Sequence, residues 1–240
     1  MKLRDGSETS DPRLDLIFEE DGRSREFGIR DWLSDKPRKS RRWPCRRWLD
    51  QGKEGACVGY AIAHELIAKP VEVPGINGQY AKTVIYWGAQ ASDKWPGGSY
   101  PGADPQYEGT SMLAGVKFAQ RLGWFESYHW AFGLQDLIMG IAYEGPAVMA
   151  TQWYSGMNRP DRSGFVKVTG DVTGRHCFLC RGVSLSKKWF LIRNSWGRDW
   201  GDHGDCYITF SGMERLLEER GHAVFFRGRR RNPMEERADR

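Results

Sequence analysis

The chain has 240 residues, a net charge of +5 and an aromatic content of 13%. This length allows one large domain or two small lobes with a sizeable core, and the aromatic content excludes an intrinsically disordered chain. The mean hydropathy of -0.64 and the lack of any apolar run of about 18 residues exclude a membrane-spanning helix. The N-terminus has no apolar stretch typical of a secretory signal, so we expect a cytoplasmic protein with no membrane partner.

Five cysteines form an odd set without a repeated spacing; they are Cys45, Cys57, Cys177, Cys180 and Cys206. In a chain without a secretory signal, this pattern predicts free thiols in a reducing compartment. The excess positive charge is local, in the run from Arg38 to Arg47 and in the tail from Arg229 to Arg231. Such runs are most often solvated loops and chain ends, and a weak contact with a polyanion is the alternative.

The first 143 residues predict mostly helices. Residues 1–26 have no periodic apolar face and are expected to form an arm or irregular lead-in, and residues 27–33 a short strand or turn. The basic run is expected to be a loop, and the Gly- and Pro-rich residues 92–109 a long surface loop. The expected helices cover residues 57–68, 79–91, 111–121 and 134–143.

The rest of the chain predicts strands, at residues 147–152, 164–168, 176–183, 189–194, 205–210 and 223–227. Helices followed by strands favour an α+β fold of two lobes. We expect an N-terminal arm and basic loop (1–45), a helical lobe with a nucleophile (46–143), a β-rich lobe (144–227) and a basic flexible tail (228–240).

Four residues, in the order Gln51, Cys57, His176 and Asn194, have the chemistry of a thiol peptidase. Cys57 stands where a helix is expected to begin, and the free amides there favour a thiolate. His176 would complete the ion pair and act as general base and acid, and Asn194 would orient its ring. Gln51 precedes the thiol across a glycine-rich turn, from which its amide could donate to an oxyanion beside the backbone N–H of Cys57.

Each residue has an ordinary structural explanation by itself, and only the set of four favours catalysis. A zinc site built from Cys177, Cys180, His203 and Cys206 is disfavoured, because a three-residue step in a strand points side chains to opposite faces. We therefore expect neither a metal nor an organic cofactor.

Three segments resemble those of the papain-like cysteine peptidases. The stretch from Leu49 to Cys57 is similar to the family's oxyanion and nucleophile segment, and Gly174 to Cys177 to its general-base segment. The stretch from Ile192 to Gly204 is similar to its Asn-Ser-Trp-Gly-x-x-Trp-Gly motif. The resemblance covers residues 27–226 and implies a helical lobe and an antiparallel β-barrel-like lobe, with the active site in the cleft between them.

The resemblance also implies roles for single residues. Cys57 would be the nucleophile, His176 the base, Asn194 its orienter and Gln51 an oxyanion donor. Trp196, with Ser195 before it, would shield the hydrogen bond between His176 and Asn194 from water. The substrate-binding residues would be Gly109 and Thr110 along a strand edge, with Ala150 and Cys177 in the apolar specificity pocket.

The chain departs from the family next to the nucleophile. Glu54 replaces a cysteine and Val58 an aromatic residue, and a carboxylate at Glu54 would raise the pKa of Cys57 if it pointed inward. The lead-in before Gln51 is too short for the family's folded inhibitory prosegment. In this respect the chain is more similar to bacterial and phage members of the family. It would be a small regulatory or docking arm, or the enzyme would be made active.

The expected function is therefore a cysteine endopeptidase acting on a peptide or protein substrate. Two alternatives stay open. One is a catalytically silent papain-like module with a structural or polyanion-binding role, and the other is an acyl transferase or amidase that uses the same triad.

Overall fold

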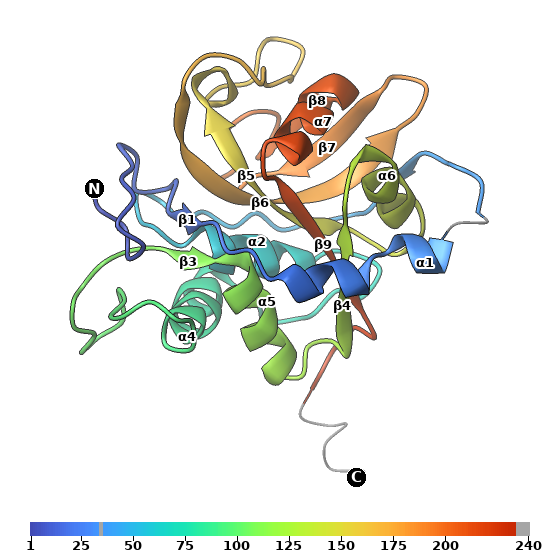
Figure 1. Ribbon diagram of the computed structural model, residues 1–240. Coiled ribbons are helices and arrows are strands. Elements are labelled where there is room, and N and C mark those ends of the chain that lie inside the picture. The colour runs from blue at the N-terminus through green and yellow to red at the C-terminus, as the bar shows by residue number, and fades with distance from the viewer. Residues whose placement is uncertain (34–35, 234–240) are drawn as a thin grey trace.

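The computed structural model describes residues 1–33 and 36–233. It has an α+β fold with helices in one lobe and a mostly antiparallel sheet in the other (Figure 1). The helical lobe contains α2 (Cys57–Leu66), α3 (Gly78–Tyr80), the π-helical segment η2 (Ala81–Tyr86), α4 (Trp87–Gln90) and α5 (Met112–Arg121). The helices expected at 57–68, 79–91 and 111–121 are thus confirmed, the second of them as a helical run divided by its π-helical turn.

The α2 helix is the centre of the helical lobe, and each of its residues is buried. It approaches η2 closely because Gly59 has no side chain. A Cβ atom at Gly59 would lie 2.2 Å from the carbonyl oxygen of Ala81. This close contact fixes α2 against η2, which carries Tyr86.

The sheet has the strand order β4-β9-β5-β6-β7-β8, and β2 pairs with β6 beside this path. Its neighbouring strands are antiparallel. The strands are β2 (Arg41–Arg42), β4 (Ser127–Ala131), β5 (Ala147–Tyr154), β6 (Val172–Ser184), β7 (Trp189–Arg193), β8 (Asp205–Thr209) and β9 (His222–Arg227). The helix α6 (Leu134–Tyr143) has the predicted bounds, and α7 (Phe210–Glu218) follows β8.

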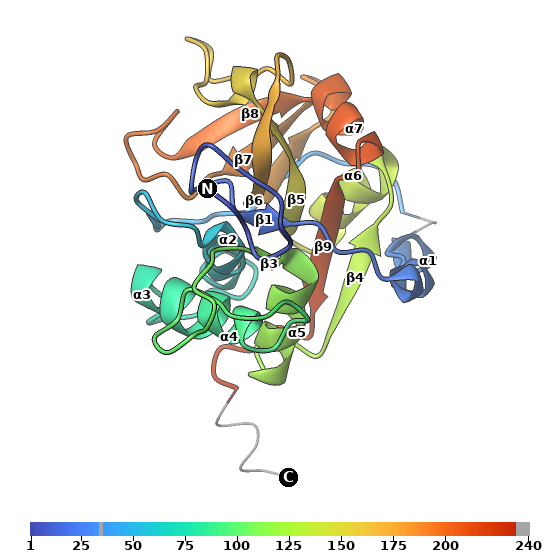
Figure 2. The same ribbon diagram turned by 60° about the vertical axis from the view of Figure 1, so that its left-hand side comes forward.

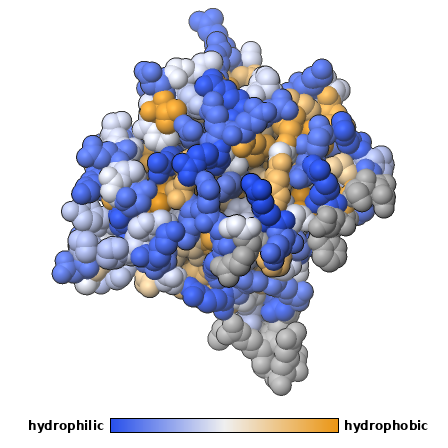
Figure 3. All heavy atoms as spheres, viewed as in Figure 1, coloured by the Kyte–Doolittle hydropathy of each residue, from blue (hydrophilic) through white to orange (hydrophobic). Residues whose placement is uncertain are grey.

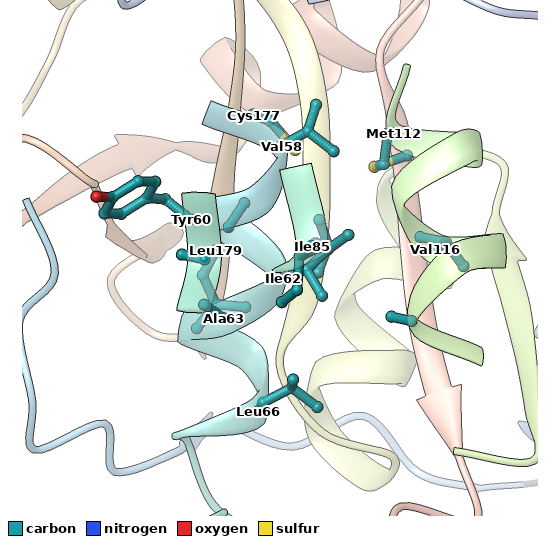
Figure 4. Packing of buried hydrophobic residues seen from close by; sticks show 14 of the residues in the cluster. Val58, Tyr60, Ile62, Ala63, Leu66, Ile85, Met112, Val116, Cys177 and Leu179 are labelled. Carbon is teal, nitrogen blue, oxygen red and sulfur yellow. The ribbon is translucent and has the colours of Figure 1, made fainter. Parts of the chain in front are cut away.

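Two apolar cores lie on opposite faces of the long strand β6. Cys177 and Leu179 pack with Val58 and other residues of α2, as Figure 4 shows. Cys180 belongs to the second core, with Phe178 and residues of β7. Cys177 and Cys180 therefore point to opposite faces, as their spacing predicted. The described cysteines are free and buried.

The N-terminal residues are packed into the fold, where the sequence predicted only an irregular lead-in. The strand β1 (Leu16–Ile17) pairs in parallel with β3 (Thr110–Ser111), and Asp15 forms a parallel bridge with Arg175 of β6. Figures 1 and 2 show this stretch running between the helices and the sheet. Its apolar side chains are buried although they are not periodic; they are those of Leu3, Leu14, Leu16 and Ile17.

Other expectations were wrong in detail. Residues 27–33 are only partly as expected: Gly28 forms an isolated bridge with Trp130 and Ile29 lies in a turn, but Phe27 ends the 3₁₀ helix η1 (Gly22–Phe27) and α1 covers Arg30–Leu33. Residues 164–168 form no strand beyond an isolated bridge between Phe165 and Tyr207. The strand β4 and the helix α7 were not predicted: β4 has only five residues, and α7, although clearly amphipathic, follows β8 without an intervening residue.

The basic segments are less free than their composition predicted. Arg229 forms an ion pair with Glu65, and their side chains are only 7% and 1% exposed. Arg47 donates to the carbonyl oxygens of Val73 and Ile76, and Arg41 stacks on Trp43.

On the face drawn in Figure 3, hydrophilic side chains surround small apolar areas. Residues 234–240 lie outside the described part of the chain, and in the described part no helix has the length and apolar character needed to cross a membrane.

Candidate active site

The fold links the four residues that the sequence singled out: His176 contacts Asn194, Gln51 contacts the next residue, Ser195, and Cys57 lies beside Cys177, the neighbour of His176. Cys57 is the first residue of α2, and Gln51 lies in the turn before it. His176 lies on β6, and Asn194 directly follows β7. The four side chains are at most 3% exposed.

His176 and Asn194 have the geometry of a base and its orienter. Nε2 of His176 lies 2.8 Å from Oδ1 of Asn194, to which it can donate. The ring of Trp196 lies 5.2 Å from that of His176, and the ring of Trp153 lies 4.9 Å from it. Two indole rings thus lie against the imidazole.

Cys57 lies beside the residue that follows His176, since its thiol interacts with the backbone of Cys177. Burial raises the pKa of the Cys57 thiol well above its usual value, and the nearby carboxylate of Asp15 raises it further. Burial lowers the pKa of His176 to about 4, although the hydrogen bond to Asn194 acts in the opposite direction. In this conformation burial disfavours the charged form of each group, so the thiolate–imidazolium pair expected from the sequence is not favoured.

Gln51 is fixed by hydrogen bonds on both sides of its amide. Its Oε1 accepts from the hydroxyl of Ser195 at 2.6 Å, and its Nε2 donates to the carbonyl oxygen of Glu54 at 2.8 Å. Its Nε2 is also 3.5 Å from the carbonyl oxygen of Arg13. Ser195 therefore holds Gln51, in addition to preceding Trp196.

The segment of residues 11–17, here called the cleft segment, lies on these groups. The carbonyl oxygen of Arg13 is 3.2 Å from Nδ1 of His176. The carboxylate of Asp15 accepts the backbone N–H of Cys57 at 3.2 Å and also contacts the thiol. Asp15 is completely buried. Sequence reasoning missed it, because one Asp in an aperiodic stretch carries no signal.

Tyr86 connects Asp15 to a second carboxylate. Its hydroxyl lies 2.7 Å from Oδ2 of Asp15 and 3.0 Å from Oε2 of Glu108, and it accepts the backbone N–H of Gly109 at 2.8 Å. Burial raises the pKa of Glu108 to about 7, and the charge of Asp15 contributes to this shift. Tyr86 and Glu108 were also not identified from the sequence.

The cleft segment also occupies the expected substrate-binding residues. Its strand β1 pairs with Thr110 and Ser111, next to Gly109. Leu16 belongs to the same apolar core as Ala150 and Cys177, the residues expected in the specificity pocket. The strand edge at Thr110 and Ser111 is therefore paired with the chain itself.

Glu54 and Val58, the two residues beside the nucleophile that differ from the family's pattern, lie in different environments. The side chain of Glu54 is 55% exposed and pairs with Lys82 at 2.6 Å, so it points away from the thiol. Val58 is buried in the core of the helical lobe. Among the residues that the structure describes, no group of three His, Cys, Asp or Glu side chains has a geometry suited to a metal ion.

Comparisons with known proteins bear on the fold of the chain. No family model matches the chain. Cathepsin B-like protease 1 of Arabidopsis thaliana is 27% identical over 133 residues, which are 51% of this chain and 35% of that protein. The chain thus spans about a third of the length of this curated relative.

Solved structures match over most of the chain. Xylellain, a cysteine protease from Xylella fastidiosa, has a TM-score of 0.69 and 16% identity, covering 93% of this chain and 99% of that chain. Bromelain protease from Ananas comosus, in complex with the E64 inhibitor, has a TM-score of 0.52 and 14% identity, covering 83% and 97%. Digestive procathepsin L 3 of Tenebrio molitor has a TM-score of 0.55 and 13% identity, covering 91% and 75%. The resemblance found in the sequence is confirmed at the level of the fold: this chain has the two-lobed α+β fold of the papain-like cysteine proteases.

Proposed function

We propose that the protein is a cysteine endopeptidase with Cys57 as its nucleophile. The observation that carries the proposal is the hydrogen bond of 2.8 Å between His176 and Asn194. The residue that follows His176 in the chain, Cys177, contacts Cys57. Nδ1 of His176 is not engaged by Asn194 and lies 3.2 Å from Arg13 O, so it would be the nitrogen that acts on the thiol. A base held at one nitrogen and directed to a thiol by the other is the arrangement that nucleophilic catalysis requires.

The reaction would start when the cleft segment leaves and His176 takes the proton of Cys57. The thiolate attacks the substrate carbonyl carbon, and the oxyanion accepts from the backbone N–H of Cys57 and from Nε2 of Gln51. The C–N bond then breaks, the amine leaves with the proton of His176, and a thioester remains. Water, deprotonated by His176, hydrolyses the thioester and restores the free thiol.

The test uses the Asp15→Ala chain, in which the carboxylate at the thiol is removed. We expect this chain to cleave an unfolded, carboxymethylated protein substrate, with new N-termini identified by mass spectrometry. Adding the Cys57→Ser substitution is expected to lower the rate by at least about 10³-fold. Adding Cys180→Ala, which alters another buried thiol, is the matched control and leaves cleavage in place.

Absence of new termini with a folded Asp15→Ala chain contradicts peptidase activity, as does cleavage that persists without Cys57. The same assay with an added primary amine separates hydrolysis from acyl transfer. A product extended by the amine would favour the transferase alternative, because water and amine compete for the same thioester.

A further inference from the structure

Exposed cations gather around β2 and the turn that follows β6, and they are here called the basic surface. They are Lys36, Arg38, Lys39, Arg41, Arg42, Lys187 and Lys188. Within the part of the chain that the structure describes, none of these side chains forms an ion pair with a carboxylate. The net charge of the whole chain is only +5, so the rest of the molecule is net negative. The positive charge is therefore concentrated on this surface.

Two segments that are far apart in the sequence form the basic surface. The strand β2 pairs with the C-terminal part of β6. The turn after β6, which contains Lys187 and Lys188, is joined to the residues before β2 by a hydrogen bond of 3.0 Å, from the backbone N–H of Leu185 to the hydroxyl of Ser40. Cations of both segments therefore lie side by side.

The two arginines of β2 lie over aromatic rings. The guanidinium carbon of Arg41 is 4.2 Å from the ring centroid of Trp43, and that of Arg42 is 4.7 Å from the ring centroid of Trp189. No hydrogen bond of the described residues uses the N–H groups of these two side chains. A guanidinium held in this way keeps its N–H groups available for a carboxylate, which it can bind in bidentate geometry.

Tyr143 holds two of the lysines in a similar way. The ammonium nitrogens of Lys36 and Lys39 are 4.8 and 3.9 Å from its ring centroid, and its hydroxyl donates to the carbonyl oxygen of Pro37 at 2.6 Å. Side chains that are already held by aromatic rings lose less conformational entropy when they bind an anion. The basic surface is thus prepared for a partner with several negative charges.

The strand β2 favours an extended peptide as this partner. Among the strands of the described residues, β2 pairs only with β6, so its second edge has no strand beside it. An extended peptide can bind such an edge through its backbone. Cations on an edge strand repel a second copy of the same edge, and they attract a strand that carries carboxylates.

A single-stranded nucleic acid fits the basic surface less well. Proteins that bind such strands stack the bases on exposed aromatic rings. Trp43 and Trp189 are only 7% and 6% exposed, and the arginines of β2 lie over their rings. The surface therefore offers charge and a strand edge, without free ring faces for bases.

We propose that the basic surface binds an extended, acidic segment of a protein partner, which lies along β2 with its carboxylates on the lysines and arginines. The site on β6 is six residues from His176, which is roughly 20 Å along the strand. One protein chain can therefore bind here and reach the candidate active site with another segment. The inference rests on the proposed function only for this consequence, that acidic proteins are its substrates.

The experiment is a titration of a labelled, glutamate-rich peptide with the full chain at pH 7 and about 0.1 M salt, followed by fluorescence anisotropy. The wild type is expected to bind this peptide and not the same peptide with Gln in place of Glu. Arg41→Glu/Arg42→Glu is expected to weaken binding at least about tenfold, because like charges then face each other. The matched control is Arg159→Glu/Arg162→Glu, the same change of charge at exposed residues between β5 and β6, which should stay within about twofold of the wild type.

A second variant tests whether the two segments act together. Lys39→Glu/Lys187→Glu changes one cation on each segment and is expected to weaken binding at least about fivefold. Circular dichroism establishes that each variant is folded. Saturable binding that is absent in the wild type, or equal in the wild type and both variants, overturns the proposal. Tighter binding of a single-stranded RNA of equal charge also overturns it. The assay needs no catalysis, so an inactive Cys57 would leave its result unchanged.

Discussion

Single residues decide the state of the site. Burial disfavours the charged forms of the Cys57 thiol and the His176 imidazole in this conformation, and Asp15 adds a like charge near the sulfur. The ion pair that the proposed mechanism needs is therefore coupled to the departure of Asp15. The chemistry of the site and the position of the cleft segment form one equilibrium.

Asn194 is expected to act through His176. Replacing Asn194 with Ala in the Asp15→Ala chain removes the acceptor 2.8 Å from Nε2 and frees the ring to rotate. We expect kcat/KM to fall about 10²-fold or more, with a shifted pH profile and an unchanged folded state. Steady-state kinetics on a fluorogenic peptide measure this. Asn77→Ala is the control: it removes a helix cap, should cost about 1 kcal/mol of stability and should leave kcat/KM unchanged. Equal effects of the two substitutions would contradict the role of Asn194.

At the scale of elements, the contact between α2 and η2 positions both Cys57 and Tyr86. Gly59→Ala would gain up to about 1 kcal/mol from helix propensity. The new Cβ would meet a backbone oxygen at 2.2 Å, which cannot move away by rotation of a side chain. We therefore expect a net loss of about 2 kcal/mol in the free energy of unfolding, measured by urea denaturation.

Gly22→Ala is the matched control, because a Cβ there has no heavy atom within 4 Å. Its effect should stay within about 0.5 kcal/mol. A Gly59→Ala chain as stable as the wild type would show that α2 and η2 are not in the close contact described here.

The sequence predicted the elements that carry the candidate site because their signals are local. The apolar run of α2 and the strand patterns around His176 and Asn194 each lie within one element, and the order of the four residues restricts the chemistry. Asp15, Tyr86 and Glu108 could not be predicted, because their roles come from contacts across 71 and 22 residues of chain. The position of residues 11–17 between the lobes depends on tertiary contacts, and no periodic pattern in the sequence predicts it.

At the scale of the whole molecule, the N-terminal residues join the lobes. The side chains of Arg4 and Asp93 form an ion pair 2.8 Å long and are 0% and 1% exposed. Arg4 also donates to the carbonyl oxygens of Gln90 and Gly109. Buried Leu14 and Leu16 add apolar contacts that each contribute roughly 2 kcal/mol.

Arg4→Ala is expected to lower the free energy of unfolding by about 3 kcal/mol, because it leaves the buried carboxylate of Asp93 without its cation. The control is Arg220→Ala, which breaks an ion pair with Glu20 whose side chains are 58% and 64% exposed, and which should cost less than about 1 kcal/mol. Urea unfolding of the two chains measures the difference. Equal costs would show that the N-terminus contributes little to the stability of the fold.

The most direct test of the central claim is the rate at which a papain-type epoxide inhibitor modifies Cys57, followed by intact mass at pH 7. The account predicts one adduct, formed at least about tenfold faster in Asp15→Ala than in the wild type. It also predicts no adduct in Asp15→Ala/Cys57→Ser. The control is Asp5→Ala, which removes an N-terminal carboxylate that pairs with Arg175 and should leave the rate of modification as in the wild type. Equal rates in the wild type and Asp15→Ala, or no adduct in either folded chain, would contradict the claim that Cys57 is an active thiol covered by Asp15.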